Sequence, residues 1–90
     1  MPEISTQELR GTKQAVERLL EELGVRAFLY TIEEKNGAWT ATIECALDGD
    51  WQTRVLPVDP HALAASLRDP ELRARLRADW ESRLRACLLG

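Results

Sequence analysis

The chain has 90 residues, of which 44% are hydrophobic and 30% are charged, and its formal net charge at pH 7 is −3. These values are typical of a folded domain and exclude an intrinsically disordered chain. A net negative chain does not attract nucleic acid or an anionic membrane over long range, so neither is expected as a partner. We expect one domain, residues 1–90, with a small core, because a chain this short buries only roughly 60–65% of its unfolded surface.

The two cysteines, Cys45 and Cys87, give no sign of a metal site or a disulfide framework, because they lack a CxxC or metal-ligand spacing. No apolar run near the N-terminus resembles a signal peptide, and none is long enough to span a bilayer. The sequence therefore predicts a cytoplasmic protein with reduced thiols, not bound to a membrane.

The first predicted helix begins at Ser5, because Ser5 and Glu8 have the spacing of a capping box. Gly24 is the kind of residue that ends a helix. Gly11 is expected to weaken the second turn of this helix, since glycine lowers helix stability. The apolar residues at helical spacing between these ends are Leu9, Val16, Leu19, Leu20 and Leu23.

Residues 25–35 and 38–47 predict two antiparallel strands, joined by Asn36-Gly37 in a type I′ turn. A two-residue turn pairs Lys35 with Ala38 and, further along, Phe28 with Cys45. This register gathers eight apolar side chains on one face: Phe28, Tyr30, Ile32, Trp39, Ala41, Ile43, Cys45 and Leu47. A slip of one residue would scatter them, so this register is the firmest structural prediction.

A third strand is predicted over residues 51–58, and the length of the preceding loop decides which of its side chains face the core. If residues 48–50 all form the loop, Trp51 joins the apolar face and Arg54 lies opposite Glu44 on the other face. A two-residue loop would instead turn Gln52, Arg54 and Leu56 inward. The longer loop is favoured, because it buries Trp51 and leaves Arg54 paired.

Two Asp-Pro pairs predict helices after the sheet, since Asp before Pro is a helix-start signal. Asp59-Pro60 precedes a short helix over residues 61–68, and Asp69-Pro70 precedes a long one over residues 71–88. The apolar stripe of the long helix is Leu72, Leu76, Trp80, Leu84, Cys87 and Leu88. The fold class is therefore α+β, in the order α-β-β-β-α-α, with a three-stranded antiparallel meander packed against helices.

This element order is similar to that of double-stranded RNA-binding domains. In those domains the helix after the sheet has a lysine-rich start, which reads the phosphates. The matching region here, residues 55–67 (VLPVDPHALAASL), contains no Lys or Arg. The resemblance covers the topology of most of the chain and does not extend to the RNA-binding chemistry.

The second face of the predicted sheet is less polar than a solvated sheet face normally is. The residues expected there form the candidate interface: Ala27, Leu29, Thr40, Thr42, Glu44, Ala46, Arg54 and Leu56. If the helices all cover the other face, this set stays exposed, and an exposed patch of this kind usually marks a protein interface. The sequence therefore favours a protein-interaction or assembly module that forms a homodimer. The alternative is that the helices divide between the two faces.

The long helix is rich in arginine, and Arg73, Arg77 and Arg83 lie beside or within its apolar stripe. These arginines are interpreted as partners for acidic residues of the first helix, namely Glu17, Glu21 and Glu22. A weaker hypothesis is that they dock an acidic protein. Association with nucleic acid through this helix is a further alternative, although acidic residues interrupt the run.

A small enzyme built on Cys45 and His61 is the second alternative. Cys45 lies in mid-strand on the apolar face, where a small buried hydrophobe is expected rather than a nucleophile. His61, the one histidine, is predicted to be a solvated residue at the start of a helix. No catalytic residue, metal or cofactor is therefore expected.

Overall fold

The computed structural model describes residues 5–25, 28–47 and 49–88. Helix α1 (Thr6–Glu22) precedes a sheet of β1 (Phe28–Lys35), β2 (Ala38–Leu47) and β3 (Asp50–Pro57). The chain continues through α2 (Pro60–Ser66), α3 (Pro70–Arg83) and the single turn α4 (Arg85–Leu88). The strands are antiparallel in the order β1-β2-β3, so the predicted α+β class and element order are confirmed.

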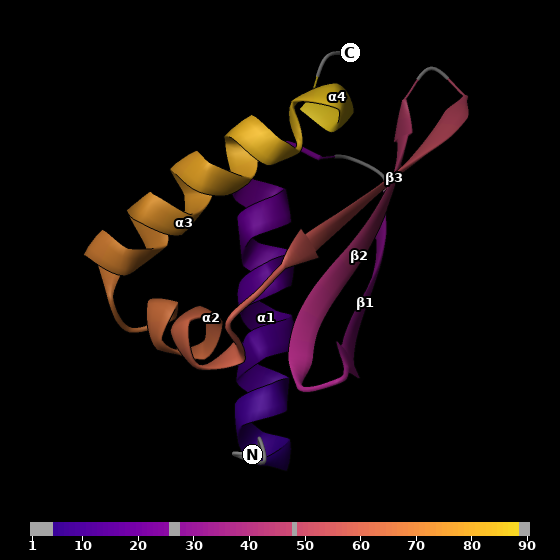
Figure 1. Ribbon diagram of the computed structural model, residues 1–90. Helices are drawn as coiled ribbons and strands as arrows, with labels where there is room; N and C mark the ends of the chain where they lie inside the picture. Colours follow the sequence, from indigo (N-terminus) through magenta and orange to yellow (C-terminus); the bar gives the residue numbers. More distant parts are fainter. Residues whose placement is uncertain (1–4, 26–27, 48, 89–90) are drawn as a thin grey trace.

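The helices gather on one side of the sheet (Figure 1). The sheet residues that are buried, such as Ala41, Ile43 and Leu56, all point to that side. The core comprises Ala15, Val16, Leu19, Leu20, Val25, Ala41, Ile43, Cys45, Leu56, Leu63, Trp80, Leu84 and Cys87. We call the covered side of the sheet its inner face and the opposite side its outer face.

Helix α1 begins and ends as predicted. The amide of Glu8 donates a hydrogen bond of 3.0 Å to the hydroxyl of Ser5, and Gly24, just past the helix, has a φ of +82°. Gly11 also has a structural explanation, because a Cβ there would lie 3.3 Å from the Cβ of Ala64 on α2. The glycine therefore lets the two helices approach closely.

A buried hydroxyl also joins α1 to the start of α2. The Thr12 side chain is fully buried, and its hydroxyl lies 2.9 Å from the carbonyl of Glu8 and 3.0 Å from that of Pro60. The hydroxyl has a single hydrogen, which is shared between the two carbonyls. This contact fixes the end of the sheet–helix connection against the second turn of α1.

The β1–β2 hairpin has the predicted register, with Lys35 opposite Ala38 and Phe28 opposite Cys45. Asn36 and Gly37 have φ values of +54° and +81°, as a type I′ turn requires. The inner face of the hairpin therefore carries the apolar set that the alternation predicts, including the buried Ala41, Ile43 and Cys45.

The favoured register of β3 is wrong. Leu47 pairs with Asp50, so the loop has two residues, and Leu56 lies opposite Ala41 on the inner face. Leu56 is buried, whereas Trp51 points to the outer face and is 57% exposed. The physical reason is position along the strand: Leu56 belongs to the core that α1 and α2 share with the sheet, near the end of β3 that lies beside α1 in Figure 1, while the start of β3, next to the β2–β3 turn, projects beyond α1. Near that turn, an inward polar residue keeps contact with water at little cost.

The two Asp-Pro helix starts are confirmed. The carboxylate of Asp59 accepts a hydrogen bond of 3.0 Å from the amide of His61, and that of Asp69 accepts one of 3.1 Å from the amide of Leu72. The long helix predicted over residues 71–88 is interrupted at Leu84, whose φ and ψ are −105° and +18°. Trp80, Leu84 and Cys87 of the predicted stripe are buried, whereas Leu72 and Leu76 are only partly buried.

Cys45 and Cys87 form a disulfide, with their Cα atoms 5.9 Å apart. The prediction that the two thiols stay reduced is therefore wrong, although Cys45 is buried on the inner face as expected. The cysteines meet because α3 carries the chain back across α1 and α4 then lies against β2. Disulfides are rare in the cytosol of mesophiles. The bond therefore gives no support to the cytoplasmic location, which stays a prediction.

Candidate interaction face

The outer face of the sheet carries large hydrophobic side chains that no described helix covers. Three large hydrophobic side chains are exposed in the described part of the chain, and all three lie here: Leu29 (60%), Trp51 (57%) and Val55 (60%). An apolar sheet face without a covering layer usually marks a contact with another protein. This face is therefore the leading candidate for a functional surface.

Large and small side chains lie on different strands of this face. On β3, Trp51 pairs with Ala46 and Val55 pairs with Thr42. On β1, Leu29 lies opposite Glu44. Large side chains thus line both edge strands, while the central strand between them carries the small residues Thr40, Thr42 and Ala46, with Glu44 between Thr42 and Ala46. We call this row of small residues the central strip.

The structure changes part of the predicted interface. Leu29, Thr40, Thr42, Glu44 and Ala46 do lie on the outer face. Arg54 and Leu56 do not, because the register of β3 turns both to the inner face. Ala27 lies outside the described residues.

The predicted pair between Glu44 and Arg54 is also wrong, since Glu44 faces Thr53 and Arg54 faces Ile43. The Arg54 guanidinium instead donates a hydrogen bond of 3.2 Å to the carbonyl of Thr53. Trp51 and Val55 are the outer-face residues that the favoured register missed. The Asp48-Gly49 pair was the signal that could have found them, because Asp-Gly is typical of a two-residue hairpin loop.

The arginines of α3 make contacts within the chain. Arg73 and Arg77 lie 3.9 Å and 3.7 Å from the two carboxylate oxygens of Glu22, and Arg83 lies 3.0 Å from Asp79. Of the three acidic partners predicted on α1, Glu22 is the one that meets them. Docking of an acidic protein on Arg73, Arg77 and Arg83 stays a prediction.

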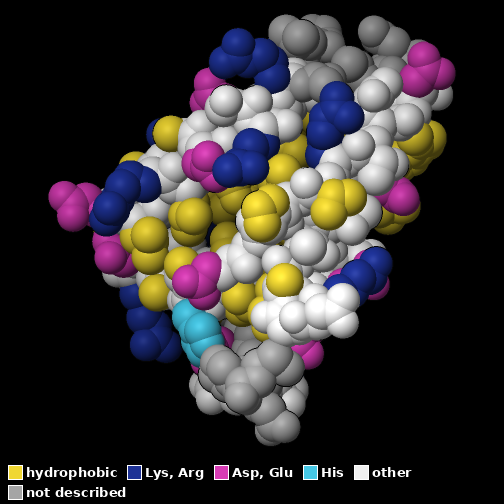
Figure 2. Space-filling view, in the orientation of Figure 1, with side chains coloured by type: hydrophobic (Ala, Val, Ile, Leu, Met, Phe, Trp, Pro, Cys, Tyr) yellow, Lys and Arg dark blue, Asp and Glu magenta, His cyan; other side chains and the backbone are white. Residues whose placement is uncertain are grey.

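Acidic side chains alternate with basic ones around α3 (Figure 2), which gives no uniform basic surface for nucleic acid. Glu71, Asp79 and Glu81 share the helix with its arginines. Association with nucleic acid through this helix stays a prediction.

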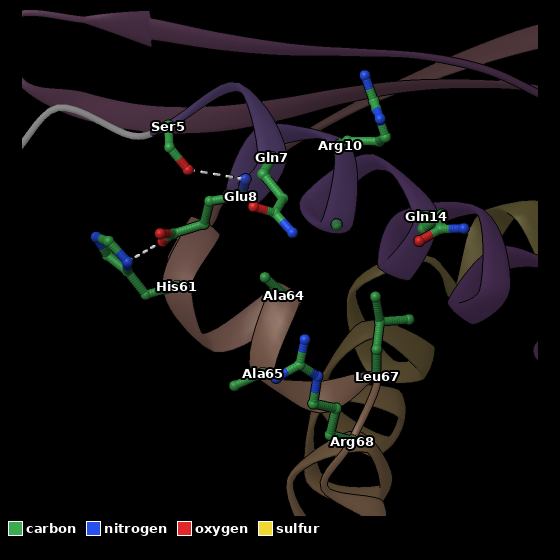
Figure 3. Close-up of a pocket in the computed structure, with 11 residues that line it drawn as sticks. Ser5, Gln7, Glu8, Arg10, Gln14, His61, Ala64, Ala65, Leu67 and Arg68 are labelled. Atoms are coloured by element: carbon green, nitrogen blue, oxygen red, sulfur yellow. Dashed lines mark hydrogen bonds and ion pairs between the residues drawn. The ribbon is translucent and has the colours of Figure 1, made fainter.

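A second surface feature is an open depression of about 780 Å³ between the first turns of α1 and helix α2 (Figure 3). Its floor includes Gly11, Ala64 and Leu67, and polar side chains such as Gln7 and Arg68 stand at its rim. His61 lies at one end, where its Nδ1 contacts the carboxylate of Glu8.

The depression does not bring together the residues of the proposed thiol enzyme. His61 contacts Glu8 at the start of α1, whereas the sulfur of Cys45 is bonded to Cys87. A sulfur in a disulfide is not a free thiolate nucleophile. The Cys45/His61 site therefore does not form in this structure.

Tyr30 on the inner face has a strongly shifted titration. Its hydroxyl donates a hydrogen bond of 2.7 Å to the carboxylate of Glu17. Burial, this hydrogen bond and the negative charge of Glu17 raise the pKa of Tyr30 to about 12. Glu17, which the sequence assigned to an arginine, thus serves to hold β1 against α1.

Within the described ranges, no three His, Cys, Asp or Glu side chains come together in a way that could hold a metal ion. None of the described helices combines the length and apolar character needed to cross a membrane. Comparisons of the chain with protein-family models, curated proteins and solved structures found no match.

Proposed function

We propose that the chain is a protein-interaction module that forms a homodimer through the outer face of its sheet. The observation that carries this proposal is the position of Leu29, Trp51 and Val55, which are exposed together on the one sheet face that no described helix covers. Burial of apolar surface is the main driving force for protein association.

The shape of the face favours a second copy as the partner. Trp51 and Val55 form a ridge on β3, and the central strip on β2 lies directly beside it. Under two-fold symmetry, the ridge of one copy can lie over the central strip of the other, and the same contact is made twice. Glu44 lies on the central strand between Thr42 and Ala46, so the two copies must leave its carboxylate in contact with water, since burial of an unpaired carboxylate is costly.

The size of the face sets the expected affinity. Three strands about 4.8 Å apart, each about eight residues long at about 3.3 Å per residue, give a footprint of roughly 400 Å². A standard interface buries about 800 Å² of accessible surface on each partner. We therefore expect a weak dimer, with a dissociation constant in the micromolar range.

Substitution of Thr42 by Asp tests the proposal. Thr42 lies on the central strip and is partly buried, opposite Val55. In the proposed packing the new carboxylate would lie under the ridge of the other copy and lose water without a partner, which costs several kcal/mol. Light scattering after size exclusion at tens of micromolar should give about twice the monomer mass for the native chain and the monomer mass for Thr42→Asp.

Gln14→Glu is the matched control, because it adds the same charge on the exposed side of α1. It should leave the dimer intact, and far-ultraviolet circular dichroism should be unchanged in both variants. A native chain that is monomeric at this concentration would refute the homodimer. A dimer that survives Thr42→Asp would place the interface elsewhere.

A further inference from the structure

The C-terminal segment formed by α3 and α4 makes few close contacts with the rest of the domain. Within α3, Trp80 is the one buried residue among fourteen, and Leu72 and Leu76 are only partly covered. Hydrophobic side chains remain visible beside α3 in the space-filling view (Figure 2). The helix therefore lies over the core without closing against it along its length.

The ion pairs of α3 add little to its attachment. Arg73 and Arg77 lie at 3.9 Å and 3.7 Å from Glu22, and about a third to a half of each side chain is exposed. Ion pairs of this length at a solvated site contribute little to stability. A recess of about 170 Å³ between these residues shows that the first half of α3 is not closely packed against α1.

The disulfide is the covalent attachment at the other end of the segment. Cys87 lies on α4, a helix of one turn, and Cys45 lies on the central strand β2. Leu84 is buried just before α4, and among the described side chains at the end of the segment the buried ones are Trp80, Leu84 and Cys87. The covalent bond thus supports a segment that places three of the thirteen described core residues: Trp80, Leu84 and Cys87.

The remainder of the domain has a continuous core of its own. The buried residues outside the segment belong to α1, the sheet, α2 and the α1–β1 connection: Ala15, Val16, Leu19, Leu20, Val25, Ala41, Ile43, Cys45, Leu56 and Leu63. Loss of contact with α3 and α4 would therefore leave α1, α2 and the sheet packed together.

We propose that the Cys45–Cys87 disulfide is a redox latch that holds α3 and α4 against the inner face of the sheet. A dithiol reductant opens it: a thiolate of the reductant attacks Sγ of Cys87, the more exposed of the two cysteine residues, and Cys45 leaves as a thiolate that takes up a proton. The second thiol of the reductant then displaces Cys87. Two electrons pass from the dithiol, which becomes a disulfide, to the two cysteines, which become thiols.

Opening of the latch releases α3 and α4 and uncovers the inner face around Ile43 and Cys45. This inference does not depend on the proposed homodimer, because it concerns the opposite face of the sheet. Local release of one segment, with the rest of the domain intact, is the behaviour expected where one region holds a small share of the buried contacts.

Hydrogen exchange followed by mass spectrometry tests the latch. Amides of α3 and α4 in the oxidised chain should be protected, and dithiothreitol should raise their exchange rates by about tenfold or more. Amides of α1 and β2 serve as the internal control and should change by less than about twofold. Cys87→Ala, without reductant, should reproduce the pattern of the reduced chain.

Three results would overturn the proposal. If the rates rise equally in α1, β2 and α3, reduction unfolds the whole domain and no latch exists. If the rates do not change, noncovalent contacts hold the segment without the bond. Titration of thiols in the denatured, previously oxidised protein should find no free thiol, and two free thiols would show that the bond does not form.

Discussion

At the scale of single residues, the fold raises the pKa of Tyr30 strongly. Its pKa of about 12 lies above the ordinary value of 10.0 because burial and Glu17 both favour the neutral phenol. A group whose pKa is higher in the folded state stabilises that state fully below its unfolded pKa. Its contribution should therefore be complete below about pH 10 and should be lost as the pH rises through about 12.

Tyr30 is the single tyrosine of the chain, so its titration can be followed directly by phenolate absorbance. We expect an apparent pKa near 12 in the folded protein. Glu17→Gln should lower the apparent pKa toward the ordinary value, because it removes the negative charge beside the hydroxyl. Tyr30→Phe should abolish the absorbance change, and the loss of folding stability between pH 10 and 12 should become smaller. A native midpoint near 10 would show that the contact with Glu17 is absent in solution.

At the scale of elements, two adjacent residues on β3 point to opposite faces of the sheet. Leu56 is buried against the helices, whereas Val55 is 60% exposed on the outer face. Leu56→Asp should unfold the domain, because an unpaired buried carboxylate costs several kcal/mol, which is of the order of the total stability of a small domain.

Val55→Asp is the matched substitution one position away and should leave the monomer fold intact. Thermal melts of both variants, followed by circular dichroism at a concentration below dimer formation, decide between the two registers. Equal melting temperatures, or a larger loss for Val55→Asp, would contradict the register of β3.

The same strand shows where prediction from the sequence reaches its limit. The β1–β2 register could be predicted because Asn36-Gly37 fixes the turn and the alternation then leaves one consistent apolar face. On β3, one register turns Trp51 and Val55 toward the core, and the other turns Leu56 toward it. The Asp48-Gly49 pair favours the register with a two-residue loop, whereas the expected burial of Trp51, to which the prediction gives more weight than to this turn signal, favours the other.

The candidate surface was partly predictable for the same reason. Its β1 and β2 members, including Leu29 and Thr42, follow from the hairpin register, whereas Trp51 and Val55 depend on β3. The disulfide was not predictable, because Cys45 and Cys87 meet only through the path of α3 across α1. No spacing of two cysteines reports a contact of that kind.

At the scale of the whole molecule, the domain is a thin plate. Its principal extents are 40 × 29 × 18 Å, and its radius of gyration is 12.9 Å. A compact chain of 90 residues would have a radius of about 12 Å. The thin dimension corresponds to one layer of helices on one sheet, so the plate has a polar helical side and a partly apolar sheet side.

A plate with a single apolar side also limits how far assembly can proceed. If two copies join by their outer faces, neither has an equivalent face left, so growth stops at a closed pair of four layers, helix, sheet, sheet and helix. The strand edges offer little alternative, because charged residues end β1 at Glu33, Glu34 and Lys35, and Pro57 at the end of β3 has no amide to donate. Sedimentation velocity over a wide concentration range should therefore show monomer and dimer in exchange and no larger species. A continuous series of heavier species would mean that copies add edge to edge, as in a growing fibre, rather than face to face.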